Sequence, residues 1–151
     1  MKAVDLGNMV LAEIGRISRA ISCGEAWKIW MQVECVVQLR SNGIQVAREV
    51  RYPFPCDGQC LDLLAQDEAG QYAIELEVES INTAGTELLE VAKQNMIRIL
   101  DYPLTEAGAR FVVVIGYSRI ALDALSSFAA TPANNAVFDM TNGIGVMVAT
   151  R

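Results

Sequence analysis

Residues 72–80, YAIELEVES, alternate between apolar and acidic side chains from Ile74 to Glu79, and no other stretch constrains the fold as much. A period of two residues is that of a β-strand, in which successive side chains point to opposite faces of the sheet. One face of this strand therefore carries aliphatic side chains, and the other carries Glu75, Glu77 and Glu79. Because like charges repel, the pattern predicts either a solvated acidic face or a bound cation.

The hydrophobic periodicity of the remaining chain predicts an α/β fold. Helices are predicted at residues 4–21, 25–40, 86–101 and 120–130, and strands at residues 44–52, 61–65, 72–80, 111–117, 136–140 and 145–149. A loop at residues 66–71 joins the second and third strands as a hairpin, and the third helix then crosses over to a buried strand. This order predicts a mixed central sheet flanked by helices, in a single domain over residues 1–151.

The absence of histidine from the sequence excludes whole classes of chemistry. Ser-His-Asp and Cys-His catalysis and His-ligated zinc all require an imidazole. Any acid–base or metal chemistry must therefore use carboxylates, lysine, tyrosine or cysteine. The net charge of −6 argues against a general nucleic-acid coat protein, which needs a basic face. A metal-dependent nuclease stays compatible with this charge, because bound metal would offset clustered carboxylates.

The apolar and cysteine content bears on location and assembly. No apolar run approaches the roughly 18 residues of a membrane span, and the first 20 residues are typical of a helix rather than of a signal peptide. We therefore expect a cytoplasmic protein with free thiols. Cys56 and Cys60 could form a labile disulfide, but they lack the further ligands of a structural zinc site. A mean hydropathy of +0.27 favours a homodimer that buries part of the surface.

A carboxylate cluster is expected where the second and third strands pair. The hairpin places Asp62 opposite Glu75 or Glu77, and directly opposed residues have Cβ atoms about 4.5–5.5 Å apart. Such a cluster is tolerated if it is solvated or if a divalent cation binds to it. Mg²⁺ and Mn²⁺ favour carboxylate oxygens and keep water ligands for a substrate phosphate. The residues therefore predict a Mg²⁺ or Mn²⁺ site, with an ordinary solvated strand as the alternative.

This stretch resembles the PD-(D/E)XK nuclease superfamily, the restriction-endonuclease-like fold, and most of all its Holliday-junction-resolvase-type members. In that family a helix with a Glu precedes a strand, and the next two strands carry an Asp and a Glu-x-Lys. Here Glu34 lies in VECVVQLRSNG before the strand IQVAREVRY, and Asp62 lies in LDLLA. Residues 77–80, EVES, occupy the position of the Glu-x-Lys motif. The resemblance covers about residues 25–117.

The resemblance implies roles for particular residues. Asp62 and Glu77 would be metal ligands, and Glu34 would be an accessory carboxylate. Glu79 stands at the position of the catalytic Lys, where some active restriction enzymes of the superfamily carry Glu or Gln and where inactive members have also lost the Lys. Lys93, on the following helix, could supply the missing cation. The Pro that often precedes the Asp is also replaced, by Leu61.

Three functions stay open from the sequence. The first is a divalent-metal-dependent nuclease that hydrolyses phosphodiesters of DNA. The second is a catalytically inactive protein of the same fold that binds a protein partner or has a regulatory role. The third is an unrelated α/β protein whose acidic strand merely faces solvent. Glu34 and Lys93 have ordinary surface positions as their alternatives, and the Trp27–Trp30 pair is typical of core packing or a dimer interface.

Overall fold

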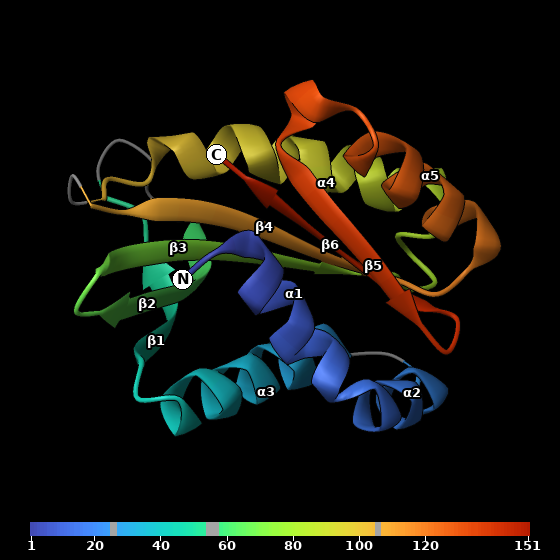
Figure 1. The fold of residues 1–151 in the computed structure, drawn as a ribbon, viewed down its shortest axis with the longest axis horizontal. Helices are drawn as coiled ribbons and strands as arrows, with labels where there is room; N and C mark the ends of the chain where they lie inside the picture. The colour runs from blue at the N-terminus through green and yellow to red at the C-terminus, as the bar shows by residue number, and fades with distance from the viewer. Residues whose placement is uncertain (25–26, 54–57, 105–106) are drawn as a thin grey trace.

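A six-stranded mixed sheet with the order β1-β2-β3-β4-β6-β5 forms the centre of the molecule, with helices on both faces (Figure 1). The structure is a computed structural model and describes residues 1–24, 27–53, 58–104 and 107–151. The helices are α1 (Ala3–Ala12), α2 (Ile14–Ser22), α3 (Trp27–Ser41), α4 (Thr86–Arg98) and α5 (Arg119–Ala129), with 3₁₀ turns at Ile99–Asp101 and Pro132–Asn134. The strands are β1 (Gln45–Arg51), β2 (Cys60–Asp67), β3 (Gly70–Val78), β4 (Ala109–Gly116), β5 (Ala136–Thr141) and β6 (Ile144–Thr150).

The topology confirms the predicted α/β class and order of elements. Strands β1, β2 and β3 form an antiparallel meander, and α4 crosses over to β4, which pairs parallel to β3. Strand β6 lies antiparallel to β4, and β5 is the edge strand beside it. Helices α1, α2 and α3 cover one face and α4 and α5 the other, so each face has its own hydrophobic core.

Two local predictions are wrong. The helix predicted at residues 4–21 is two helices, because α1 packs on β5 and β6 while α2 packs on α3, and the chain bends at Glu13 between them. The loop predicted at residues 66–71 is a turn of only two residues, Glu68 and Ala69. It is tight because Asp67 Oδ1 accepts hydrogen bonds from Ala69 N and Gly70 N. Gly70, the first residue of β3 after this turn, has a φ of 146°, which a side chain would disfavour.

The acidic face of β3 is buried rather than solvated. Glu75 and Glu79 are 0% and 1% exposed, because helix α4 packs over this face of the sheet. The burial therefore excludes the alternative of a solvent-facing acidic strand. Buried carboxylates must be paired or hydrogen-bonded, so each has a local partner to be identified. Trp27 is also buried, which confirms the core-packing prediction for that residue.

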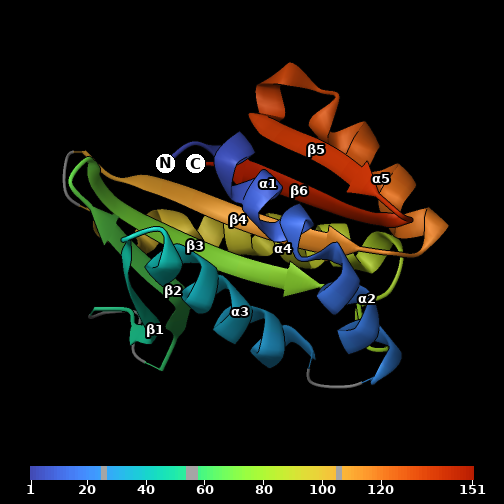
Figure 2. The same cartoon turned by 60° about the horizontal axis from the view of Figure 1, so that its bottom comes forward.

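A fork between β2 and β3 positions the acidic residues. Their ladder ends at the pair Leu63–Ile74, and β3 continues alone toward Val78 on that side. Leu61 and Leu63 pack into opposite cores although residues two apart on a regular strand share a face, so β2 twists at Asp62. Figure 2 shows β3 running on between α3 and β4 after β1 and β2 have turned away. The free edge of β3 is therefore open to side chains.

Two further observations concern the location and cysteine predictions. No helix in the described part of the chain is long and apolar enough to cross a membrane. Cys23 and Cys60 are exposed, and Cys35 is a buried free thiol. Cys56, the predicted disulfide partner of Cys60, lies outside the described residues.

Candidate functional site

Asp62 fills the fork between β2 and β3 with its side chain. Leu76 N, on the free edge of β3, donates a hydrogen bond to Asp62 Oδ2 at 2.7 Å, in place of a strand partner. Gln32, on α3, donates from Nε2 to Asp62 Oδ1 at 2.6 Å. The carboxylate is therefore held from the strand and from the helix at once. Its orientation is fixed, as a site for a charged ligand requires.

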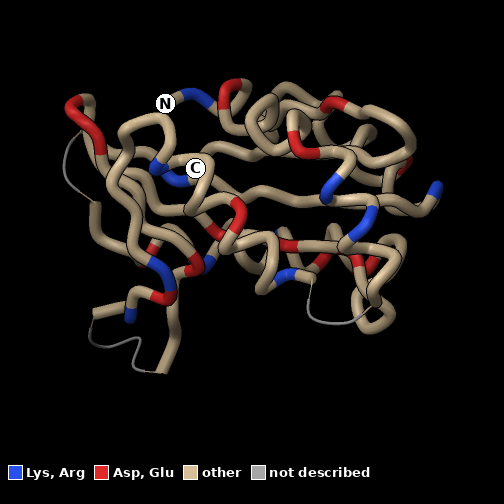
Figure 3. The backbone as a smooth tube through the Cα atoms, turned by 90° about the horizontal axis from the view of Figure 1, so that it is seen from below, with Lys and Arg blue, Asp and Glu red and all other residues tan. Residues whose placement is uncertain are grey.

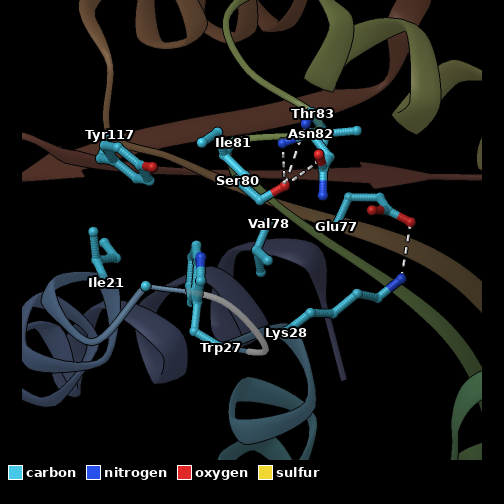
Figure 4. A pocket seen from close by; sticks show the side chains of 11 residues that line it. Ile21, Trp27, Lys28, Glu77, Val78, Ser80, Ile81, Asn82, Thr83 and Tyr117 are labelled. Atoms are coloured by element: carbon cyan, nitrogen blue, oxygen red, sulfur yellow. Dashed lines mark hydrogen bonds and ion pairs between the residues drawn. The ribbon is translucent and has the colours of Figure 1, made fainter.

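Lys28 joins Asp62 to Glu77. It lies one helical turn before Gln32 on α3, and its Nζ is 2.9 Å from Glu77 Oε1 and 3.4 Å from Asp62 Oδ2. Figure 4 shows the Lys28 side chain extended along the sheet to reach Glu77. Burial disfavours the charged ammonium, but the attraction of Asp62 and Glu77 outweighs it and raises the pKa of Lys28. Lys28 is therefore protonated at neutral pH.

Glu77 is reached from both faces of the sheet. Lys28 comes from α3 on one face, and Asn95 Nδ2 of α4 donates to the same oxygen, Glu77 Oε1, at 2.6 Å from the other. Glu77 Oε2 accepts no hydrogen bond from the described residues, and the side chain is 12% exposed. One carboxylate oxygen thus stays available to a ligand. We call Lys28, Gln32, Asp62, Glu77 and Asn95 the fork cluster.

Glu75, near Asp62 of the fork cluster, belongs to a buried network of a hydrogen bond and an ion pair. Tyr52 donates its hydroxyl to Glu75 Oε1 at 2.9 Å, and Arg98 Nη2 forms an ion pair with the same oxygen at 2.9 Å. Glu75 Oε2 is buried without a partner among the described residues. Burial and the neighbouring charge of Asp62 raise the pKa of Glu75 to about 7, against the opposing effect of Arg98 and Tyr52. This carboxyl group therefore titrates near neutral pH.

The substitution Glu75→Gln is expected to make stability less dependent on pH. Because folding raises the pKa of Glu75 from 4.5 to about 7, its contribution to stability is present below pH 4.5 and is lost as the pH rises through 7. The free energy of unfolding of the variant, relative to that of the wild type, should thus rise by about 1 kcal/mol or more between pH 5 and pH 8. Urea titrations of both proteins measure it, with the exposed Glu68→Gln as control. A difference that stays constant over this range would contradict the prediction.

Glu79 is bound entirely by hydrogen-bond donors at the beginnings of α4 and α5. Gly85 N, at 3.0 Å, and the Ser118 hydroxyl donate hydrogen bonds to Oε1. Tyr117 N and Ser118 N donate to Oε2, and both of these bonds are 2.7 Å long. Burial alone would raise the pKa of Glu79, but these bonds, above all those of Ser118, lower it. Glu79 is therefore an anion that ties β3 to two helices. It has no free oxygen with which to take part in chemistry at the fork cluster.

Glu34 and Lys93 contact residues outside the fork cluster. Glu34 is buried on α3, where Arg16 Nη1 of α2 pairs with its Oε1 at 2.7 Å. Lys93 pairs with Glu90 on the same helix at 2.7 Å and lies over the ring of Phe128. Positions two apart on a helix point about 200° apart, so Lys93 faces away when Asn95 reaches Glu77. The structure thus brings Asp62 and Glu77 together through Lys28, and it places Glu34, Glu79 and Lys93 elsewhere.

Sequence reasoning missed Lys28, Gln32 and Asn95. A usable signal was present, because Lys28 and Gln32 are four residues apart, and thus on one face, in the mostly apolar first half of α3. Asn95 likewise interrupts the buried stripe of α4 between Ala92 and Met96. Polar residues on a buried face need a partner, which here is a carboxylate of the sheet.

The two carboxylates of the fork cluster are oxygen donors of the kind that a hard divalent cation prefers. The side-chain ammonium group of Lys28 already lies between the carboxylates of Asp62 and Glu77. Glu77 Oε2 accepts no hydrogen bond from the described residues. Mg²⁺ needs only one or two protein carboxylates, since water and substrate complete its shell. Among the described residues no group of three or more acidic or cysteine side chains is arranged to hold a metal ion. A cation would therefore depend on these two carboxylates and on withdrawal of Lys28.

Comparison with protein-family models, with curated proteins and with solved structures gives no match for this chain.

Proposed function

We propose that this protein is a divalent-metal-dependent nuclease of the restriction-endonuclease-like, PD-(D/E)XK type, acting on DNA. The supporting observation is the fork cluster, in which a lysine contacts two carboxylates, one on each arm of a forked strand pair. This combination of two oxygen ligands and one cation is what metal-assisted phosphodiester hydrolysis needs. In this proposal Lys28 has the role that the resemblance assigns to the motif lysine, because Glu79 stands at the motif position and is engaged elsewhere.

Each side chain of the fork cluster would have a separate role. Asp62 and Glu77 would hold Mg²⁺ or Mn²⁺, while Gln32 and Asn95 keep the two carboxylates oriented. A bound ion would lower the pKa of a water molecule and neutralise charge on the phosphate. Because its pKa is raised, Lys28 would act as a charged hydrogen-bond donor to a phosphate oxygen rather than as a general base. It would move from the carboxylates to the phosphate when substrate binds.

Metal binding is the first expected result. Calorimetric titration with Mn²⁺ should give saturable binding to the wild type at or below millimolar concentration, and at least about tenfold weaker binding to Asp62→Asn and Glu77→Gln, since each removes one of two ionic ligands. Glu90→Gln, which removes an exposed carboxylate from α4, is the matched control and should bind as the wild type does. Unchanged binding in both fork-cluster variants would contradict the proposed site.

DNA cleavage should then be measured on duplex, single-stranded and branched substrates in Mg²⁺ and Mn²⁺. Figure 3 shows basic residues spread among acidic ones along the described chain. With a net charge of −6 we expect DNA binding to be weak and to fall steeply with salt, so the assay belongs at low ionic strength. The homodimer and the cytoplasmic location stay predictions.

An inactive protein of the same fold is the second candidate, and one observation favours it. Lys28 already neutralises Asp62 and Glu77, and hydrogen-bond donors occupy three of their four carboxylate oxygens. The cluster could therefore be a purely structural ion pair within a protein-binding module. Absence of Mn²⁺ binding at millimolar concentration, together with a lower free energy of unfolding in Glu77→Gln, would favour this candidate over the nuclease.

A further inference from the structure

A pocket of about 460 Å³ opens beside the fork cluster. Its lining comes from the end of α2, the beginning of α3, the end of β3 and the turn that follows β3, together with Tyr117 after β4. Lys28 and Glu77 belong both to this lining and to the fork cluster. Figure 4 shows Tyr117 and Ile21 at the end of the pocket opposite to these two residues. The pocket is thus a lateral extension of the proposed active site.

The pocket is divided chemically along its length. Lys28 and Glu77 provide charge at one end, and no other described residue in its lining is charged. Ile21, Trp27 and Val78 form apolar walls, and Tyr117, whose ring also lines the pocket, is 38% exposed as a residue. The ligand that suits this division has an anionic group at one end and a flat, uncharged, largely apolar group at the other. The volume lies within the range of about 300–1,000 Å³ that is common for small-molecule sites.

The polar groups at the rim are not all engaged. The hydroxyls of Ser80 and Thr83 bond to each other at 2.8 Å, and the Ser80 hydroxyl also accepts from Asn82 N at 3.3 Å. These bonds fix the turn after β3. The Asn82 side-chain amide makes no hydrogen bond to the described residues, so it can donate and accept at the edge of a ligand.

We propose that this pocket binds an unstacked nucleobase of the substrate strand, with the adjoining phosphate at Lys28. This inference rests on the proposed nuclease function and adds the substrate class, a nucleic acid with an unpaired nucleotide. A base is flat and uncharged, stacks on aromatic rings, and is one nucleotide unit from the phosphate that the fork cluster would hold. A base inside a duplex cannot enter a lateral pocket, since it is stacked and paired. Single-stranded or branched substrates are therefore favoured over continuous duplex.

The test measures strand binding in EDTA, so that it does not depend on metal or on cleavage. The probes are a fluorescein-labelled thymidine hexanucleotide, an abasic hexamer with the same phosphates, and a short duplex, each measured by anisotropy at low salt. We expect the thymidine strand to bind at least tenfold more tightly than the abasic strand and the duplex. Tyr117→Ala should weaken binding of the thymidine strand about tenfold, because it removes the aromatic ring on which a base would stack.

Matched variants separate stacking from a change in fold. Tyr117→Phe keeps the ring and should bind the thymidine strand as the wild type does, and Ile97→Ala, an exposed apolar residue of α4 outside the pocket lining, should also be unchanged. Tyr117→Ala should bind the abasic strand no more weakly than the wild type does. Equal binding of thymidine and abasic strands, equal losses on both strands in Tyr117→Ala, or no binding of either strand would each overturn the pocket proposal.

The two proposals can fail separately. Tyr117-dependent binding of the thymidine strand without Mn²⁺ binding or cleavage would support the pocket and overturn the nuclease. Metal-dependent cleavage of duplex DNA that Tyr117→Ala does not change, with equal binding of thymidine and abasic strands, would support the nuclease and overturn the pocket.

Discussion

The substitution Glu79→Lys is expected to lower the free energy of unfolding by about 3–5 kcal/mol, or to prevent folding, because it places a cation among donors. Glu79 is 1% exposed, and Gly85 N, Tyr117 N and Ser118 N all point at its carboxylate. An ammonium group can accept none of these bonds, so three backbone donors would be buried unpaired. Placing a lysine at position 79, as the Glu-x-Lys motif would have it, should thus destabilise the folded state rather than create activity.

Urea unfolding followed by circular dichroism measures this effect. Glu79→Gln keeps one acceptor oxygen and should lie between the wild type and Glu79→Lys in stability. Glu68→Lys makes the same change of charge at an exposed turn residue, and its free energy of unfolding should stay within about 0.5 kcal/mol of the wild-type value. Similar losses in Glu68→Lys and Glu79→Lys would show that net charge, rather than the donor cage, is responsible.

Glu79 also makes the free energy of unfolding depend on pH in a predictable direction. The pKa of Glu79 is lower in the folded state than its ordinary value of 4.5. Its contribution to stability is therefore fully present above pH 4.5 and is lost as the pH falls through the folded-state pKa. The stability advantage of the wild type over Glu79→Gln should shrink between pH 5 and pH 3. An advantage that is unchanged at pH 3 would contradict the assignment.

Under the proposed nuclease function, the substitution Lys28→Met should have opposite effects on catalysis and on metal binding. Removing a preorganised charged donor from a site of phosphoryl chemistry costs roughly 10²–10³-fold in rate. Removing the ammonium from between Asp62 and Glu77 also removes the competitor for those carboxylates, so Mn²⁺ should bind more tightly than to the wild type. Calorimetry and single-turnover cleavage measure the two effects on the same preparation.

Lys93→Met is the matched control, because it removes an exposed lysine from α4 that pairs only with Glu90 among the described residues. It should change neither rate nor Mn²⁺ affinity. A cleavage rate of Lys28→Met equal to that of the wild type would exclude Lys28 from the chemistry. A rate loss in Lys93→Met instead would return that role to the lysine that the sequence first indicated.

The sequence determined the elements and their order because local patterns encode them. The alternation of residues 72–80, the change from helical to strand period near residue 41 and the β-branched run at residues 111–117 each predict an element that the structure contains. The hairpin also predicts that Asp62 lies near the acidic strand. It does not predict that the ladder ends at Leu63–Ile74, so that Asp62 contacts β3 through its side chain and not as a strand partner. Hydrophobic period and turn chemistry act over a few residues, so both can be read without the tertiary structure.

Which polar residues meet depends on contacts between elements that are far apart in the sequence. Lys28 reaches Glu77 across 49 positions of the chain, and Asn95 reaches it from the opposite face of the sheet. Glu79 is only two residues after Glu77 and follows the same alternation. Its carboxylate nevertheless accepts hydrogen bonds from the beginnings of two helices, α4 and α5. Periodicity gives the face on which a side chain lies but not what packs against that face. The forked edge of β3, the burial of its carboxylates and the position of Lys28 between Asp62 of β2 and Glu77 of β3 result from long-range packing.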